Sequence, residues 1–239
     1  MHVLALDTTT RSGSVAIVGD DRVLFERSGD PSRSHAERLP EDVLNALAAA
    51  NLPTGAIDFF AVASGPGSFT GLRIGIATIQ GLAVVHRKRV VPVSALRALA
   101  QAGGATLAEG TIVGAWMDAH RHDVYSALYR VCRAEPFHLE RLAELDPPAV
   151  DTPAATLARW LDSGQLPSHI VGDGAVKYLQ ELTDRAQPVA PPPLASVIAR
   201  IAVRLARAGE AVDPAGLQPV YVRRPDAEIA RDARLRRDL

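Results

Sequence analysis

The chain has 239 residues, of which 47% are hydrophobic, and its 26 basic side chains nearly balance 27 acidic ones to leave a net charge of −1. This apolar content excludes a disordered protein, and the single cysteine, Cys132, excludes a disulfide scaffold. The near-neutral charge argues against a protein whose whole surface attracts nucleic acid.

The N-terminal part of the sequence predicts three strands followed by alternating helices and strands. Ser34 and Glu37 form a capping-box pattern, and Leu39, Val43 and Leu47 recur every four residues, so a helix should begin near Ser34. The expected strands are residues 3–6, 14–18, 22–27, 58–64 and 89–93, and the expected helices are residues 34–50, 70–86 and 94–101. Hairpin-paired strands followed by strand–helix crossovers predict a ribonuclease-H-like mixed sheet.

A second copy of this unit, in degraded form, is predicted after the glycine pair at 103–104. Its expected strands are residues 111–117, 124–131, 137–142 and 169–171, and its expected helices are residues 153–161 and a segment from 175. An amphipathic helix at 195–208 follows a proline-rich connector. The predicted domains are an N-terminal ribonuclease-H-like domain at 1–103, a second, smaller one at 104–193, and a C-terminal helix and tail at 194–239 packing on the first.

A glycine-rich segment, residues 64–75, lies between a predicted strand and a predicted helix. Backbone N–H groups at such a point can hold an anion, as can the hydroxyl-rich turn that follows the first strand. The candidate nucleotide contacts are Asp7, Thr8, Thr9, Gly67 and Ser68. The segment lacks the lysine of a P-loop and the spacing of a dinucleotide fingerprint. Turns without a ligand, bonded to their own backbone, are the alternative.

The helix predicted at 70–86 is apolar almost all round, because no Asp, Glu, Lys or Arg occurs from Ile74 to His86. Such a helix should be buried on both sides, and small residues at four-residue spacing let another backbone approach closely. The covering element is either a neighbouring part of this chain or another subunit.

Four motifs resemble the TsaB family. They are Leu4–Thr9, the block Ser64–Gly75 with the sequence SGPGSFTGLRIG, Met117–Ala119 with Val124–Tyr125, and Pro219–Pro225. The matches span almost the whole chain, and the middle block is highly specific. The resemblance implies an α/β fold of the actin/Hsp70/sugar-kinase (ASKHA) type, built from two ribonuclease-H-like βββαβα halves. It also implies a non-catalytic bacterial protein of tRNA threonylcarbamoyladenosine synthesis.

The same resemblance implies partners. Members of the family pair with a paralogous catalytic subunit, TsaD, and with a small ATPase, TsaE, and they can self-associate, so we expect a homodimer when the chain is alone. tRNA would be reached through the complex. The predicted helices at 34–50 and 70–86 would pack on the same two helices of TsaD. The residues expected at this interface are Leu39, Val43, Leu47, Gly71, Arg73, Gly75 and Thr78.

Neither a catalytic residue nor a bound metal is expected. The catalytic paralog carries a His-x-x-x-His metal pair after the strand that corresponds to residues 89–93, where this chain has Ala95 and Leu99. The turn at 118–121 lacks the glycine that lets backbone approach a phosphate. No tightly bound cofactor is expected, although ATP or ADP with Mg²⁺ at the complex interface stays open. A kinase-like or protease-like enzyme of the same superfamily is the alternative, with Asp7 and Asp118 as its candidate carboxylates.

The remaining signals are weaker. His120 and His122 read as a solvated turn, and Cys132 as a buried structural thiol. The arginine-rich tail at 223–239 is either a frayed terminus or a contact to tRNA phosphates. The apolar run at the start of the chain is interrupted by Asp7, which argues against a signal peptide. The apolar run at 74–85 is too short to span a bilayer. We therefore expect a cytoplasmic protein with no membrane contact.

Overall fold

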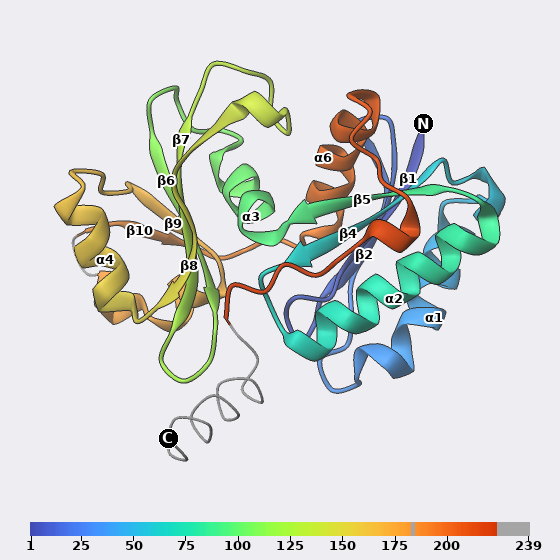
Figure 1. Ribbon diagram of the computed structural model, residues 1–239, viewed down its shortest axis with the longest axis horizontal. Helices are drawn as coiled ribbons and strands as arrows, with labels where there is room; N and C mark the ends of the chain where they lie inside the picture. Colours follow the sequence, from blue (N-terminus) through green and yellow to red (C-terminus); the bar gives the residue numbers. More distant parts are fainter. Residues whose placement is uncertain (183–184, 224–239) are drawn as a thin grey trace, which may run out of the picture.

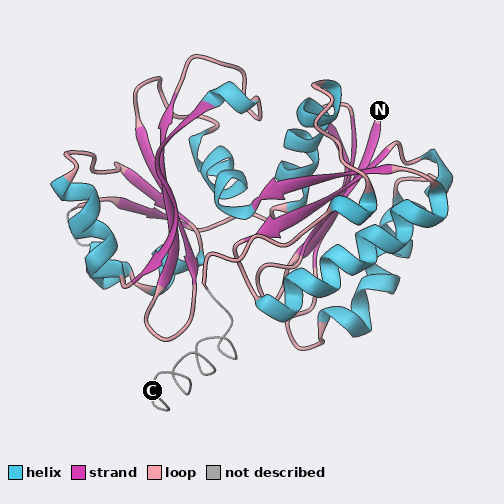
Figure 2. Ribbon diagram, viewed as in Figure 1, coloured by secondary structure: helices cyan, strands magenta, loops and turns pink. Residues whose placement is uncertain are grey.

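The computed structural model describes residues 1–182 and 185–223, which form two five-stranded sheets with helices on their faces (Figures 1 and 2). The strands of the first sheet have the order β3-β2-β1-β4-β5. β1 pairs antiparallel with β2 and parallel with β4, while β3 and β5 complete the two edges. The elements are β1 (His2–Asp7), β2 (Ser14–Gly19), β3 (Arg22–Ser28), α1 (His35–Ala49), β4 (Phe59–Gly65), α2 (Phe69–His86) and β5 (Arg89–Ser94).

The second sheet repeats this topology strand for strand, with β6 in the place of β1 and the order β10-β9-β6-β7-β8. Its elements are α3 (Ala95–Gly104), β6 (Ile112–Asp118), β7 (Val124–Val131), β8 (Leu142–Asp151), α4 (Pro153–Asp162), β9 (His169–Val171), α5 (Asp173–Lys177) and β10 (Gln187–Val189). The second copy is reduced because β9 and β10 have three residues each and α5 has five. The two ribonuclease-H-like halves are therefore confirmed.

One predicted strand is wrong. Residues 137–142 do not form the third strand of the second sheet, which begins only at Leu142. Phe137 has a positive φ of 67°, and its N–H bonds to the side chain of Gln101 at 3.1 Å instead of to a neighbouring strand. A short 3-10 helix, Leu139–Arg141, then turns the chain into β8.

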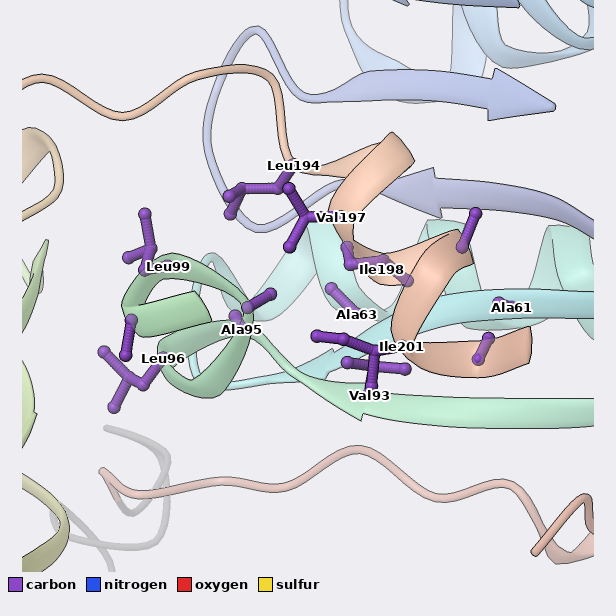
Figure 3. Packing of buried hydrophobic residues seen from close by; sticks show 14 of the residues in the cluster. Ala61, Ala63, Val93, Ala95, Leu96, Leu99, Leu194, Val197, Ile198 and Ile201 are labelled. Atoms are coloured by element: carbon purple, nitrogen blue, oxygen red, sulfur yellow. The ribbon is translucent and has the colours of Figure 1, made fainter. Parts of the chain in front are cut away.

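The helices and sheets form alternating layers. α1 and α2 cover one face of the first sheet, and α6 (Ala195–Arg207) covers the other. α3 packs beside α6 and also against the second sheet, whose outer face carries α4 (Figure 1). Figure 3 shows the buried cluster between the layers, with Leu96 of α3, Ile198 and Ile201 of α6, and Ala63 and Val93 of the first sheet.

β1, β2 and β4 of the first sheet are buried on both faces, which explains their continuous apolar runs, whereas the edge strand β3 is half-buried or exposed. In β1, Val3 and Ala5 belong to the cluster with α3 and α6, whereas Leu4 and Leu6 belong to the cluster with α1 and α2. The alternation follows from the two-residue period of a strand. The sheet therefore lies between two helical layers, which cover its faces but not the ends of its strands. The loops that follow the strands start at these ends.

α2 packs on β4 and spans 18 residues. By length and composition alone it could cross a membrane, contrary to the expectation that its apolar run is too short. Core helices of globular domains pass the same test, so one such helix is weak evidence for a membrane span.

Candidate functional site

A cavity of about 940 Å³ lies between the two halves, where β1 and β6 end. Its walls are the turn after β1, the start of α1 with the loop before it, the first residues of α2, the turn after β6, and Asp173 and Arg223. A smaller cavity of about 410 Å³ adjoins it and includes Asp7. The carboxyl ends of parallel strands are where open α/β sheets usually bind ligands. We therefore treat this cavity as the candidate site.

Asp7 ends β1 and is buried beside the cavity. Its Oδ1 accepts hydrogen bonds from the N–H of Thr9 at 2.9 Å and from the Thr9 hydroxyl at 2.6 Å. Burial raises the pKa of Asp7, and the bonds from Thr9 only partly counter this effect. The nearby Asp173 carboxylate raises that pKa further. Asp7 thus holds the turn after β1 in shape through a carboxyl group whose ionisation is unfavourable.

Replacing Asp7 by asparagine should raise the melting temperature near neutral pH. The amide oxygen can still accept both bonds from Thr9, while the buried negative charge is removed. A carboxyl group with a raised folded-state pKa costs stability once the pH rises through that pKa, so the gain should disappear in acid, where Asp7 is protonated. Differential scanning calorimetry across the acid range checks this, and an Asp7→Asn variant that melts lower at neutral pH would contradict it.

The glycine-rich segment fits tightly against the turn after β1. Ser68 donates its N–H to the carbonyl of Thr9 at 2.8 Å, and its side chain caps α2 by accepting from the N–H of Gly71 at 3.2 Å. A Cβ on Gly67 would lie 2.5 Å from the Cβ of Thr9. Thr9, Gly67 and Ser68 all line the cavity. The contacts of these residues with one another are enough to explain why they pack closely, without a ligand. Nucleotide contact at these residues therefore stays a prediction.

Thr8 is fully buried and does not line either cavity. Its hydroxyl is buried without a hydrogen-bond partner and lies 2.2 Å from where a Cβ on Gly75 would be. Its carbonyl oxygen lies 2.1 Å from where a Cβ on Gly71 would be. Both glycines therefore serve the close approach of α2 to the end of β1.

The opposite wall is a turn in an unusual conformation. His120, Arg121 and His122 have φ angles of 58°, 55° and 64°, a left-handed region that non-glycine side chains rarely adopt. The N–H of Ala119 bonds to the carbonyl of Asp123 at 3.0 Å across the base of the turn. Such backbone persists only where its surroundings hold it in place.

The carboxylates on this side are already engaged. Asp118 accepts from Lys177 at 2.7 Å and from the N–H of His120 at 3.0 Å. Burial acts to raise the pKa of Asp118, but the bonds from Lys177 and His120 outweigh it, so that pKa lies below its ordinary value. Asp173 accepts from the N–H of Asp118 at 3.1 Å, and burial raises the pKa of Asp173. Asp118 lines the cavity, but its carboxylate is bound to the neighbouring Lys177 and is not a free base.

Two side chains of α1 brace the turn after β1 and were not singled out by the sequence. His35 Nε2 lies 2.9 Å from the carbonyl of Thr10, and Arg38 bonds to the carbonyl of Ser12. A carbonyl only accepts, so Nε2 carries the proton and Nδ1 accepts from Arg38 at 2.8 Å. Burial lowers the pKa of His35; the bond to Thr10 acts to raise it, and the Arg38 charge lowers it. His35 is therefore neutral in this network.

Acid should destabilise the protein through His35. Its folded-state pKa is below the ordinary 6.5, so the unfolded chain binds the extra proton more readily and stability falls as the pH drops below about 6.5. We expect a His35→Gln variant, whose amide can still donate to Thr10, to be less stable near neutral pH and to show a shallower acid slope. Urea unfolding at a series of pH values measures both, and an unchanged slope would contradict this role.

The residues expected at a partner interface need correction. Leu39, Val43 and Leu47 are 1%, 5% and 5% exposed in the core beneath α1, and Gly71 and Gly75 face Thr8. These five residues are covered by other parts of this chain and are not open to a partner in this structure. Thr78 is half-buried and bonds to the carbonyl of Ile74 at 2.8 Å. Of the predicted set, Arg73 is exposed.

The weaker candidates take ordinary places. His120 and His122 are exposed in the turn, as expected, whereas Cys132 is half-buried rather than fully buried. Within residues 1–182 and 185–223, no group of three His, Cys, Asp or Glu side chains is placed to hold a metal ion. The tail from residue 224 lies outside the described residues.

Known proteins are similar to this chain in sequence and architecture. Residues 30–158 match the family model of TsaD, tRNA N6-adenosine threonylcarbamoyltransferase. The tRNA threonylcarbamoyladenosine biosynthesis protein TsaB of Escherichia coli is 32% identical over 93% of this chain and 95% of its own length. The chain belongs to the TsaB family. An uncharacterised protein of Mycobacterium tuberculosis is 34% identical over 95% of this chain and 93% of its own length.

The TsaB family assignment agrees with solved structures. YeaZ from Pseudomonas aeruginosa has a TM-score of 0.75 and 29% identity, covering 92% of this chain and 99% of its own. An activator of 2-hydroxyisocaproyl-CoA dehydratase from Clostridium difficile shares the fold at a TM-score of 0.50 and 10% identity, over 88% and 97% of the two chains. The fold is of the actin/Hsp70/sugar-kinase type, as the resemblance implied.

Proposed function

We propose that this TsaB-family chain is a non-catalytic subunit of a cytoplasmic complex that transfers threonylcarbamoyl to the tRNA adenosine next to the anticodon. It would pair with a TsaD-type catalytic subunit, activate it, and work with a TsaE-type ATPase. The observation that carries the proposal is an exposed apolar surface on α1 and α2. Family membership supports the pathway, and this surface supports the role of a subunit that needs a partner.

The outward face of α2 is apolar from Ala77 to Val85. Ala77, Gly81, Val84 and Val85 recur at helical spacing and are exposed, with Val84 at 64% and Val85 at 75%. Leu44 on the neighbouring helix α1 is 66% exposed. Monomers seldom leave large apolar patches in water, so this surface suits another subunit. We name these five residues the α1/α2 face.

The positions that carry the metal pair in the catalytic paralog support a non-catalytic role. Ala95 begins α3 and Leu99 follows one turn later, and both are buried in the cluster between the layers. Neither side chain can bind a metal ion. Asp118, a candidate carboxylate for a kinase-like reaction, is held by Lys177.

The same face would also account for self-association. A second copy of the chain presents the same apolar residues, so the free protein would form a homodimer that the catalytic subunit displaces. tRNA would be bound mainly by the partner, in keeping with the net charge of −1. ATP or ADP with Mg²⁺ would bind, if at all, in the assembled complex. Calorimetric titration of ADP and Mg²⁺ into the free chain and into the complex separates these cases, and binding to the free chain would count against this assignment.

Reconstitution tests the proposed function. A mixture of TsaD-type subunit, TsaE-type ATPase, tRNA and threonylcarbamoyl-AMP should produce modified adenosine rapidly only when this chain is present. Equal rates with and without the chain would overturn the proposal. Robust ATP turnover by the chain alone, lost in Asp7→Ala, would favour the kinase-like alternative instead.

A further inference from the structure

The segment after α6 crosses from the first half of the molecule to the second, and we call residues 212–223 the strap. Val212 pairs with Val90 at the edge of β5 through N–H···O bonds of 2.8 and 3.0 Å. Gln80 of α2 donates to the carbonyl of Leu217 at 3.3 Å, and Leu217 is buried in the first core. In Figure 1 the strap is the red chain that runs from beside α2 towards the second sheet. Its first part is therefore fixed to the first half.

The end of the strap lies against the first residues of α2. The N–H of Val220 donates to the carbonyl of Ser64 at 2.7 Å. The ring of Tyr221 stacks on Phe69 with centroids 5.0 Å apart, and its hydroxyl accepts from Arg73 at 3.2 Å. The Arg73 guanidinium lies 4.4 Å from the centre of the Phe69 ring. Phe69 also lines the cavity, so this cluster marks the rim of the candidate site.

Arg223 then reaches the second half. Its guanidinium donates to the carbonyl of Ala119 at 2.7 Å, forms an ion pair with Asp123, and lies 5.9 Å from the centre of the Tyr125 ring. Ala119 and Asp123 are the two residues that flank the left-handed turn after β6. Arg223 thus bridges the base of this turn while the preceding residues are held by α2. Charge-assisted bonds of this kind are stronger than neutral ones, and Arg223 and Asp123 are only 20% and 27% exposed.

We propose that residues 219–223 are a latch that, in addition to the buried cluster shared by both halves, holds the halves together at the cavity and sets the width of the cavity between them. Halves of a chain joined by connecting segments move relative to one another unless a contact prevents it. The walls of the cavity belong to different halves, and Arg223 itself lines it. Widening the cavity on this side requires that Arg223 leave Ala119 and Asp123. The latch acts within this chain and does not depend on the proposed partner.

The distance between the halves tests the latch. Spin labels at exposed positions of the two halves, introduced by Arg27→Cys and Asp162→Cys in a Cys132→Ser background, report that distance by double electron–electron resonance. Dilution with unlabelled protein removes distances between copies. We expect a single narrow distribution with Arg223 present, and a broader one shifted to longer distance in Arg223→Ala.

The matched control is Arg204→Ala, because Arg204 pairs with Asp21 at 2.7 Å entirely within the first half. It should leave the distribution unchanged, and a distribution for Arg223→Ala that superimposes on this control would overturn the latch. Arg223→Lys keeps the charge but cannot make the same forked contact, so it should broaden the distribution less and carries the test if the alanine variant fails to fold. Hydrogen exchange of the Val220 amide should speed up about tenfold or more in Arg223→Ala, and no change there would also contradict the proposal.

Discussion

Replacing Gly71 by alanine should lower the free energy of unfolding by about 1–3 kcal/mol, the usual range for overpacking a filled site. A Cβ at this position would lie 2.1 Å from the carbonyl oxygen of Thr8. That oxygen belongs to the backbone at the end of β1, so it cannot move without displacing the turn whose next carbonyl, that of Thr9, bonds to Ser68. Urea unfolding followed by circular dichroism measures the loss.

Gly81→Ala is the matched control for this prediction. It lies in the same helix, but nothing is within 4 Å of the added Cβ. Alanine favours helix over glycine by about 0.8–1.0 kcal/mol, so this variant should be more stable than the native chain. If both variants shifted stability in the same direction, the close packing of α2 on Thr8 would not be the reason for Gly71.

Replacing Val85 by arginine should weaken binding to a TsaD-type catalytic subunit about thirtyfold or more, the effect of losing a central interface residue. Val85 is 75% exposed on the α1/α2 face, so the charged side chain can remain in water in the free protein. In the complex the arginine would be buried among apolar side chains without a partner charge. Surface plasmon resonance gives the affinity, and an unchanged melting temperature shows that the fold is intact.

Leu161→Arg serves as the control for Val85→Arg. Leu161 is 53% exposed on α4, on the outer side of the second sheet, and should tolerate the charge without effect on binding. Equal affinities of the two variants would contradict the proposed interface. Sedimentation velocity of the free chain tests self-association separately. A native chain that sediments as a monomer would contradict the proposed homodimer but not the proposed pairing with the catalytic subunit.

Most of the fold follows from local patterns in the sequence. The capping box predicted the start of α1, and the structure shows Glu37 accepting from the N–H of Ser34 at 2.7 Å. The strand predicted at residues 137–142 is wrong because their composition resembles that of a strand. The contact that bends the chain there comes from Gln101 in α3, 36 residues away from Phe137. Local patterns cannot reveal such contacts.

The site was less predictable for a related reason. The sequence identified the turn at 7–9 and the segment at 67–68, which the structure brings together at the cavity. Helical periodicity showed which residues of α1 and α2 are apolar, but not which side their own sheet covers, so buried Leu39 was assigned to the interface instead of exposed Leu44. His35 and Arg223 were missed as site residues because they act through carbonyls 25 and 104 residues away.

The most direct test is the initial rate of threonylcarbamoyl transfer to tRNA in the reconstituted mixture, measured with the native chain, Val85→Arg and Leu161→Arg. An activating subunit that binds through the α1/α2 face predicts a rate for Val85→Arg close to that without the chain, with a native rate for Leu161→Arg. A native rate for Val85→Arg, or an equal rate when the chain is omitted, would contradict this account.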